Sequence, residues 1–225
     1  MTATFALIHG AGESAWAWHL VARELQERGF GAVAVDLPSE DETAGWWDYA
    51  DAVVGAVGER SDLVVVANSL GGFTAPLVCA RVPVRLLVLV TAMVPAPGEL
   101  FGEWLANTGY APAPDAPDDE DAVYYHDVPP ALAAEAKSRV RGQAEKPLDE
   151  PWPLDAWPGV PTRYLLCRDD RFFPAAWTRG MVRDRLGFDP DEMDGGHCAH
   201  LSRPEELAER LIAYVTGSGG GSTSS

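Results

Sequence analysis

The sequence predicts an α/β protein with a mostly parallel sheet of about six strands and helices on both faces. Short apolar runs of strand length alternate along the chain with segments of helical periodicity, the order expected of βαβ units. The apolar runs are nearly continuous, which is typical of strands that are covered on both faces. The chain has 225 residues, of which 47% are hydrophobic and 23% charged, enough for one domain with a well-filled core.

Each predicted element follows from a local pattern. Apolar residues at helical spacing indicate helices over residues 15–28 and 46–57. For the last helix, 204–215, Ser202 and Glu205 predict a capping box, and Pro204 suits the first turn. The strands are expected at residues 4–8, 32–36, 63–67, 85–90 and 162–167, with a weaker one near 188–193.

The stretch from about residue 95 to 157 interrupts this alternation. It is rich in proline, alanine, aspartate and aromatic residues, and it contains one clear helical segment near residues 130–143. We interpret it as a small helical cap inserted above the carboxyl ends of the strands. The prediction is therefore a single domain over residues 1–216 with a cap at about 95–157. Residues 217–225 form a flexible Gly/Ser-rich tail, either natural or an added linker.

Composition narrows the functional classes. The formal net charge of −17 disfavours nucleic acids and anionic membrane surfaces as partners. No apolar run is long enough to span a bilayer, and the first residues lack the features of a signal peptide. The three cysteines, Cys79, Cys167 and Cys198, have no paired spacing, which argues against a disulfide scaffold or a zinc site. We expect a cytoplasmic protein that acts on a small molecule, and the sequence does not indicate its oligomeric state.

A candidate nucleophile, Ser69, lies where the third predicted strand runs into a helix. In a nucleophile elbow the residues two before and two after the serine must be small, and Ala67 and Gly71 meet this requirement. The serine hydroxyl would then lie at the start of a helix, where backbone N–H groups favour developing negative charge. The alternative is a serine that only caps the helix, but a strand before it and a helix after it favour the nucleophile.

The segment His9–Gly10–Ala11–Gly12 follows the first strand and predicts an oxyanion hole. Its first donor would be the backbone N–H of Ala11, and the second the N–H of Leu70, directly after the serine. The alternative is an ordinary glycine-rich turn between a strand and a helix. His9 is expected to be a structural hydrogen-bonding residue, because the catalytic base should come late in the chain.

The acid and the base are expected on loops after the last strands, in that order. Asp169 and Asp170 both follow the strand at 162–167, and by position either could be the acid. His197, flanked by glycine between the final strand and the final helix, lies where a general base belongs. His200 is the competing candidate, but order and position favour His197. These features predict acyl transfer by a Ser-His-Asp triad that needs no metal and no cofactor.

At this point the residues resemble a known group, the small α/β-hydrolases that include plant methylesterases and hydroxynitrile lyases. The shared motifs are HGA with Trp16 and Trp18 shortly after it, SLGG, CRDDRFFP and GGHCAHLSRPEEL. The last motif is the most specific, because the family pattern H-x-x-x-L-S-[KR]-P corresponds to residues 197–204. The resemblance implies an α/β-hydrolase fold and implies that Asp170, the second acidic residue of the C-x-[DE]-D pattern, is the acid.

Two departures from this group bear on the reaction. Hydroxynitrile lyases carry a lysine just after the catalytic histidine and a cysteine just after the serine, whereas this chain has Cys198 and Leu70. The resemblance therefore favours a carboxylesterase that cleaves a small ester or thioester. Two alternatives stay open. One is a lyase, cyclase or cofactor-free oxygenase that uses His-Asp for proton transfer, and the other is a non-catalytic small-ligand receptor.

The substrate pocket is expected between the ends of the strands and the cap. Aromatic residues of the cap would favour a compact apolar or aromatic acyl group. Each of them could instead belong to the core of the cap. The candidate lining residues are Met93, Trp104, Tyr124, Tyr125, His126 and Trp152.

Overall fold

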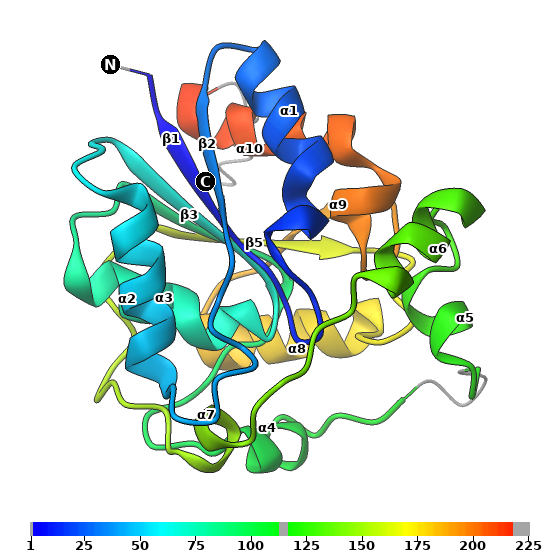
Figure 1. The fold of residues 1–225 in the computed structure, drawn as a ribbon. Helices are drawn as coiled ribbons and strands as arrows, with labels where there is room; N and C mark the ends of the chain where they lie inside the picture. The colour runs from blue at the N-terminus through cyan, green and yellow to red at the C-terminus, as the bar shows by residue number, and fades with distance from the viewer. Residues whose placement is uncertain (1, 113–116, 218–225) are drawn as a thin grey trace, which may run out of the picture.

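Six parallel strands form one sheet, in the order β2-β1-β3-β4-β5-β6 (Figure 1). The computed structural model describes residues 2–112 and 117–217. The predicted α/β-hydrolase fold with a parallel sheet is confirmed. The strands are β1 (Thr4–Ile8), β2 (Gly31–Val35), β3 (Leu63–Ser69), β4 (Leu86–Ala92), β5 (Thr162–Cys167) and β6 (Asp191–Met193).

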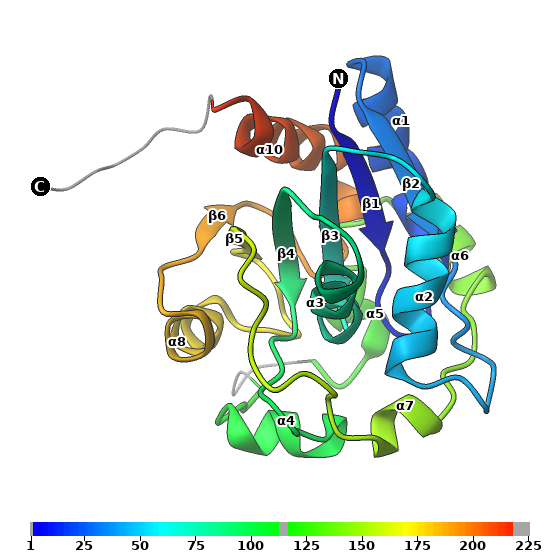
Figure 2. The same cartoon turned by 90° about the vertical axis from the view of Figure 1, so that its left-hand side faces the viewer.

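Alternate residues of each central strand face opposite sides of the sheet, and both sides are covered. In β1, Ala6 and Ile8 belong to the core that packs under α2 (Trp46–Val57), α3 (Gly71–Arg81) and α8 (Ala175–Leu186). Phe5 and Leu7 belong to the core under α1 (His19–Glu27) and α10 (Pro204–Thr216). Figure 2 shows these two helical layers on either side of the sheet.

The strand register brings the carboxyl ends of the central strands to one edge. Ile8 of β1 is level with Ala67 of β3, and Ala67 is level with Leu89 of β4. The loops that follow β1, β3, β4, β5 and β6 therefore leave the sheet on the same side. This is the edge at which open parallel sheets carry their binding sites.

Several helices differ from the sequence-based expectation. Residues 15–28 divide into a 3-10 turn, η1 (Ala15–Trp18), capped by the hydroxyl of Ser14, and the helix α1. The helix expected over 130–143 ends at Ser138, and the chain beyond it returns to the first loop, where the N–H of Arg141 donates to Gly12 O at 2.9 Å.

The predicted capping box of the last helix is wrong. Ser202 does not precede α10 in an extended conformation but ends a separate short helix, α9 (Ala199–Ser202). Its buried hydroxyl has no hydrogen-bond partner among the described residues, and Arg203 takes the N-cap position without a side-chain bond. Pro204 does occupy the first turn of α10, as expected.

The described residues between β4 and β5 form four short helices on the edge of the sheet where the strands end (Figures 1 and 2). They are α4 (Phe101–Asn107), α5 (Glu120–Tyr124), α6 (Pro130–Ser138) and α7 (Lys146–Asp149). Indole hydrogen bonds tie this segment to the main body, from Trp152 to Phe73 O at 2.9 Å and from Trp46 to Glu150 O at 3.2 Å.

The predicted Gly/Ser tail begins at Gly217, which ends α10 in a left-handed conformation, and its other residues lie outside the described part of the chain. Among the described helices, none is both long enough and apolar enough to cross a membrane.

Candidate active site

Ser69 ends β3 in a strained backbone conformation, with φ of 50°. A non-glycine residue with positive φ is uncommon, and this geometry turns the chain sharply from strand β3 into helix α3. Gly71 is required at this turn, because a Cβ there would lie 2.8 Å from His9 O. Ala67, two residues before the serine, is fully buried.

Two further glycines, whose packing role the sequence analysis did not predict, are sterically required around Ser69. A Cβ on Gly72 would lie 1.9 Å from Met93 O, and one on Gly10 would lie 2.9 Å from Ser69 Cβ. The second glycine of SLGG was the available signal for Gly72. The elbow therefore packs directly against the loops that follow β1 and β4.

The side chains of His197 and Asp170 form a buried pair. Nδ1–H of His197 donates to Oδ2 of Asp170 at 2.9 Å, and the exposed fractions of the two side chains are 4% and 0%. The other carboxylate oxygen, Oδ1, accepts from the backbone N–H groups of Phe172 at 2.8 Å and Phe173 at 2.9 Å. Because Nδ1 carries the proton toward the carboxylate, Nε2 is left as the basic nitrogen.

Thr91 contributes to this pair, and the sequence analysis did not identify it. Its hydroxyl donates to Oδ2 of Asp170, and its backbone has φ of 41° although threonine is β-branched. The side chain is 1% exposed. Its position directly before the end of β4 was the only signal available in the sequence.

Aromatic rings and a buried amide hold His197 in place. The rings of Tyr124, Phe172 and Phe173 meet the imidazole edge to face, with centroids 5.1–5.4 Å away. The amide of Asn68 donates to Val90 O at 3.1 Å and to His197 O at 3.3 Å. Ser69 and His197 line the same cavity, and within the described chain no hydrogen bond joins their side chains.

Asp169 and His126 lie beside the pair without joining it. Asp169 connects the loops after β5 and β6, because its Oδ2 accepts from Gly195 N at 3.0 Å and its N–H donates to Gly195 O at 3.0 Å. His126, expected to contact substrate, has its Nε2 3.0 Å from Asp169 O and does not line the cavity around Ser69.

The two expected oxyanion donors both border the cavity. Within residues 2–112, where both lie, no acceptor pairs with the backbone N–H of Ala11 or of Leu70. His9 is structural: its Nδ1 donates to Gly10 O at 2.8 Å, and its Nε2 accepts from Leu37 N at 3.1 Å. Burial lowers the pKa of His9 below its ordinary value, which favours this neutral form.

A cavity of about 440 Å³ lies above Ser69. Of the expected lining residues, Met93, Tyr124 and Tyr125 border it. Trp104 and Trp152 do not. They are 0% and 1% exposed within the core, and their indole N–H groups bond to Val94 O and Phe73 O. The lining also includes side chains that the sequence analysis did not select, namely Glu13, Phe101, Glu120, Asp121, Lys137, Val140, Phe172 and Cys198.

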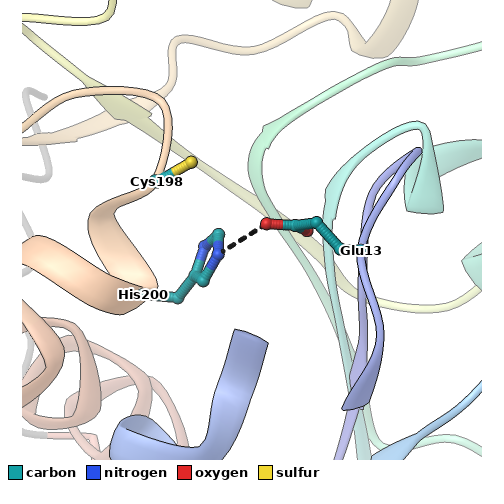
Figure 3. A group of neighbouring side chains, drawn as sticks. All are labelled: Glu13, Cys198 and His200. Carbon is teal, nitrogen blue, oxygen red and sulfur yellow. Dashed lines mark hydrogen bonds and ion pairs between the residues drawn. The ribbon is translucent and has the colours of Figure 1, made fainter. Parts of the chain in front are cut away.

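Glu13, Cys198 and His200 form a cluster of potential metal donors beside the cavity (Figure 3). One donor atom from each lies within 4.8 Å of the others. Glu13 and His200 already bond to each other at 3.0 Å. Burial alone would raise the pKa of Glu13, but the attraction of His200 and two hydrogen bonds lower it to about 2. Burial raises the pKa of the Cys198 thiol, which disfavours the thiolate that binds metals.

Comparison with known proteins agrees with this architecture. "Probable esterase PIR7A" from Oryza sativa subsp. indica is 27% identical over 252 residues, covering 92% of this chain and 95% of the rice protein. "Methylesterase 7" from Arabidopsis thaliana is 27% identical over 247 residues, covering 92% and 94%. The crystal structure of polyneuridine aldehyde esterase superposes with a TM-score of 0.80 at 20% identity, covering 96% of this chain and all of the other. Residues 5–210 match the sequence profile of the Alpha/beta hydrolase family, and the chain belongs to that family.

Proposed function

We propose that the chain is a serine carboxylesterase that cleaves a small ester or thioester through an acyl-enzyme. The observation that carries the proposal is the buried His197–Asp170 pair on the same cavity as Ser69, which lies on a strained strand-to-helix turn. This set of groups in this chain order is the one that the fold uses for acyl transfer. The relatives named as esterase and methylesterase support the same class of reaction.

In the proposed reaction, Nε2 of His197 removes the proton from Ser69, and Oγ of Ser69 attacks the ester carbonyl. The N–H groups of Ala11 and Leu70 stabilise the oxyanion that develops. His197 then protonates the leaving alcohol or thiol, and water attacks the acyl-enzyme by the same route in reverse. Asp170 keeps the imidazole in the tautomer with Nε2 available and stabilises the imidazolium.

The cavity supports a small substrate. Its volume of about 440 Å³ is within the range of small-molecule sites, and Met93, Phe101 and Phe172 contribute apolar side chains to its walls. We expect compact apolar or aromatic acyl groups to be cleaved fastest. We also propose a reducing, cytoplasmic environment, because Cys79, Cys167 and Cys198 are all free.

The decisive test combines covalent labelling with turnover. The wild type is treated with a serine-reactive phosphonate, and hydrolysis is measured on p-nitrophenyl and methyl esters of increasing chain length. We expect one label per chain, mapped to Ser69 by mass spectrometry, and loss of hydrolysis in proportion to labelling. Ser69→Ala should take no label and lose about 10⁵-fold or more in kcat.

The matched control is Ser138→Ala, which removes an exposed hydroxyl of α6 that bonds to Glu135 O in the same helix. It should label and turn over like the wild type. Equal labelling of the Ser69→Ala protein would contradict the proposal. Activity that survives in Ser69→Ala but not in His197→Ala would favour proton-transfer chemistry, and ligand binding without turnover would favour a receptor.

A further inference from the structure

We propose that Glu13 is a positioning residue for the oxyanion hole, and that His200 holds it in place. The proposal rests on the function given above, because it concerns the same site. Glu13 lines the cavity but is not one of the three residues of the proposed triad. Its carboxylate connects the loop after β1, which carries the Ala11 donor, with the short helix that follows the base His197.

Both carboxylate oxygens of Glu13 are engaged in this connection. Oε2 accepts from the backbone N–H of Gly10 at 3.0 Å, and Oε1 accepts from Nε2 of His200 at 3.0 Å (Figure 3). The side chain of Glu13 is 16% exposed and that of His200 is 0% exposed. A partly buried carboxylate with two charge-assisted bonds is well ordered, since the loss of either donor leaves one of its oxygens without a hydrogen bond.

The hydrogen bond to Gly10 acts on the peptide next to the oxyanion donor. The N–H of Gly10 belongs to the peptide between residues 9 and 10, and the N–H of Ala11 belongs to the following peptide, together with Gly10 O. Because peptides are planar, a bond to Gly10 O also orients the Ala11 N–H, and His9 makes that bond at 2.8 Å. Glu13 restrains the first plane and His9 the second, so the direction of the Ala11 N–H is set from both sides.

His200 restrains the other end of the carboxylate. Its ring packs against Trp18, with centroids 5.0 Å apart, and it lies in α9, which begins two residues after the base. The oxyanion loop and the base loop are therefore joined through one partly buried pair. Pairing also offsets a repulsion, because an unpartnered carboxylate on the cavity wall would disfavour a negative charge on the substrate oxygen.

The first experiment compares Glu13→Ala with Glu13→Gln, using Glu59→Ala as the control at an exposed acidic position. We expect kcat to fall about 100-fold in Glu13→Ala, with KM within about threefold, because displacing an oxyanion donor affects the transition state more than substrate binding. The Gln variant keeps an acceptor for Gly10 N–H and should lose about tenfold or less. The control should be unchanged.

The second experiment separates positioning from general loosening of the fold. A trifluoromethyl ketone forms an adduct with Ser69 whose negatively charged oxygen occupies the oxyanion hole. The matched alcohol, in which the ketone carbonyl is reduced, occupies the pocket but cannot form this adduct. Affinity for the ketone should fall with kcat/KM in Glu13→Ala, and affinity for the alcohol should stay within about threefold. Equal loss for both ligands, or no loss for the ketone, would overturn the proposal.

The role of His200 is tested by two substitutions and by metal removal. His200→Gln keeps an N–H donor near the position of Nε2 and should therefore retain more activity than His200→Leu. The double variant of His200→Leu and Glu13→Ala should lose no more activity than Glu13→Ala alone, because both changes break the same bond. Activity should survive a chelator. A loss on chelation that Zn²⁺ restores would assign Glu13, Cys198 and His200 to a metal and overturn the positioning role. If the Ser69→Ala protein is active, the proposed function fails. If the Ser69→Ala protein is inactive but the Glu13→Ala protein has wild-type activity, the proposed function stands and only this inference fails.

Discussion

The loops at the strand ends and the cap above them face the same cavity but differ in how firmly their side chains are held. At the strand ends, Asp170 receives bonds from Thr91, His197 and two backbone N–H groups; three of these bonds are buried, and the one from Phe172 is partly buried. In the cap, Lys137 and Asp121 pair at the surface with exposed fractions of 45% and 49%, and Val140 is 60% exposed. The groups proposed to react are therefore preorganised, while the cap side chains proposed to meet the rest of the substrate are free to adjust.

This contrast suggests a division of roles between the strand ends and the cap. Substitutions at the strand ends should act mainly on kcat or on folding, because they disturb buried bonds that cannot be replaced by water. Substitutions on the cavity side of the cap should act mainly on the choice of substrate. The following changes test that division, from the largest expected effect to the smallest.

The largest effect is expected for Asp170→Asn, with a loss of about 10⁴-fold in kcat measured on the best ester. The two N–H groups of Phe172 and Phe173 require an oxygen at the Oδ1 position, so the new NH₂ group must face Nδ1 of His197. The imidazole would then carry its proton on Nε2 and could not act as a base. Asp169→Asn is the control and should lose less than tenfold; the reverse order would assign the acid to Asp169.

His9 should make the free energy of unfolding fall as the pH drops below 6.5. Burial lowers the pKa of His9 from the ordinary value of 6.5. Just below pH 6.5, His9 therefore binds a proton in the unfolded chain but stays neutral in the folded chain. The contribution of His9 to the free energy of unfolding is fully present above pH 6.5 and is lost as the pH falls toward the pKa of His9 in the folded state. His9→Leu should remove this contribution and cost about 1–3 kcal/mol, because it leaves the N–H of Leu37 unpaired.

Urea denaturation of wild type and His9→Leu at pH values from 5 to 8 measures both effects. His126→Gln, at a half-buried position on the cap, is the control and should keep the pH dependence of the wild type. An unchanged pH profile in His9→Leu would show that His9 is not the group responsible.

Thr91→Val should lower kcat about tenfold with little change in KM. The substitution keeps the shape of the side chain and removes only the hydroxyl that donates to Oδ2 of Asp170. The other three bonds of the carboxylate remain, so the acid should be less firmly oriented but not displaced. Thr91→Ser, which restores the hydroxyl, should recover most of the activity. A Val variant with wild-type kcat would show that Asp170 needs no support from β4.

The smallest effect on kcat is expected in the cap. Phe101→Ala enlarges the cavity and should change KM by about threefold, in opposite directions for short and long acyl chains, with kcat nearly constant. Trp104→Ala, in the same helix but fully buried, should instead cost about 3–5 kcal/mol of stability and leave the relative rates on different esters unchanged. A selectivity change in Trp104→Ala would break the proposed division.

The sheet was predictable because its signal is local. Residues 4–8 and 162–167 were expected with the bounds that the structure has, since continuous apolar runs of this length have few alternatives in a soluble domain. The capping box was predicted wrongly because a Ser-x-x-Glu pattern does not reveal that Ser202 already ends another helix. Trp104 and Trp152 were expected in the pocket because an aromatic residue of a cap has the same local pattern whether it faces the cavity or the core.

The sequence by itself determined the fold and the candidate places of Ser69 and His197, because apolar periodicity and small residues at a turn are patterns of short segments. Position alone did not separate Asp170 from Asp169, and only the resemblance to the methylesterase group favoured Asp170. Only the tertiary structure decided which groups support them. Thr91 of β4 reaches Asp170 on the loop after β5, and Glu13 meets His200 across 187 positions of sequence. Such contacts depend on how strands and loops pack in space, and a single sequence carries no local pattern for them.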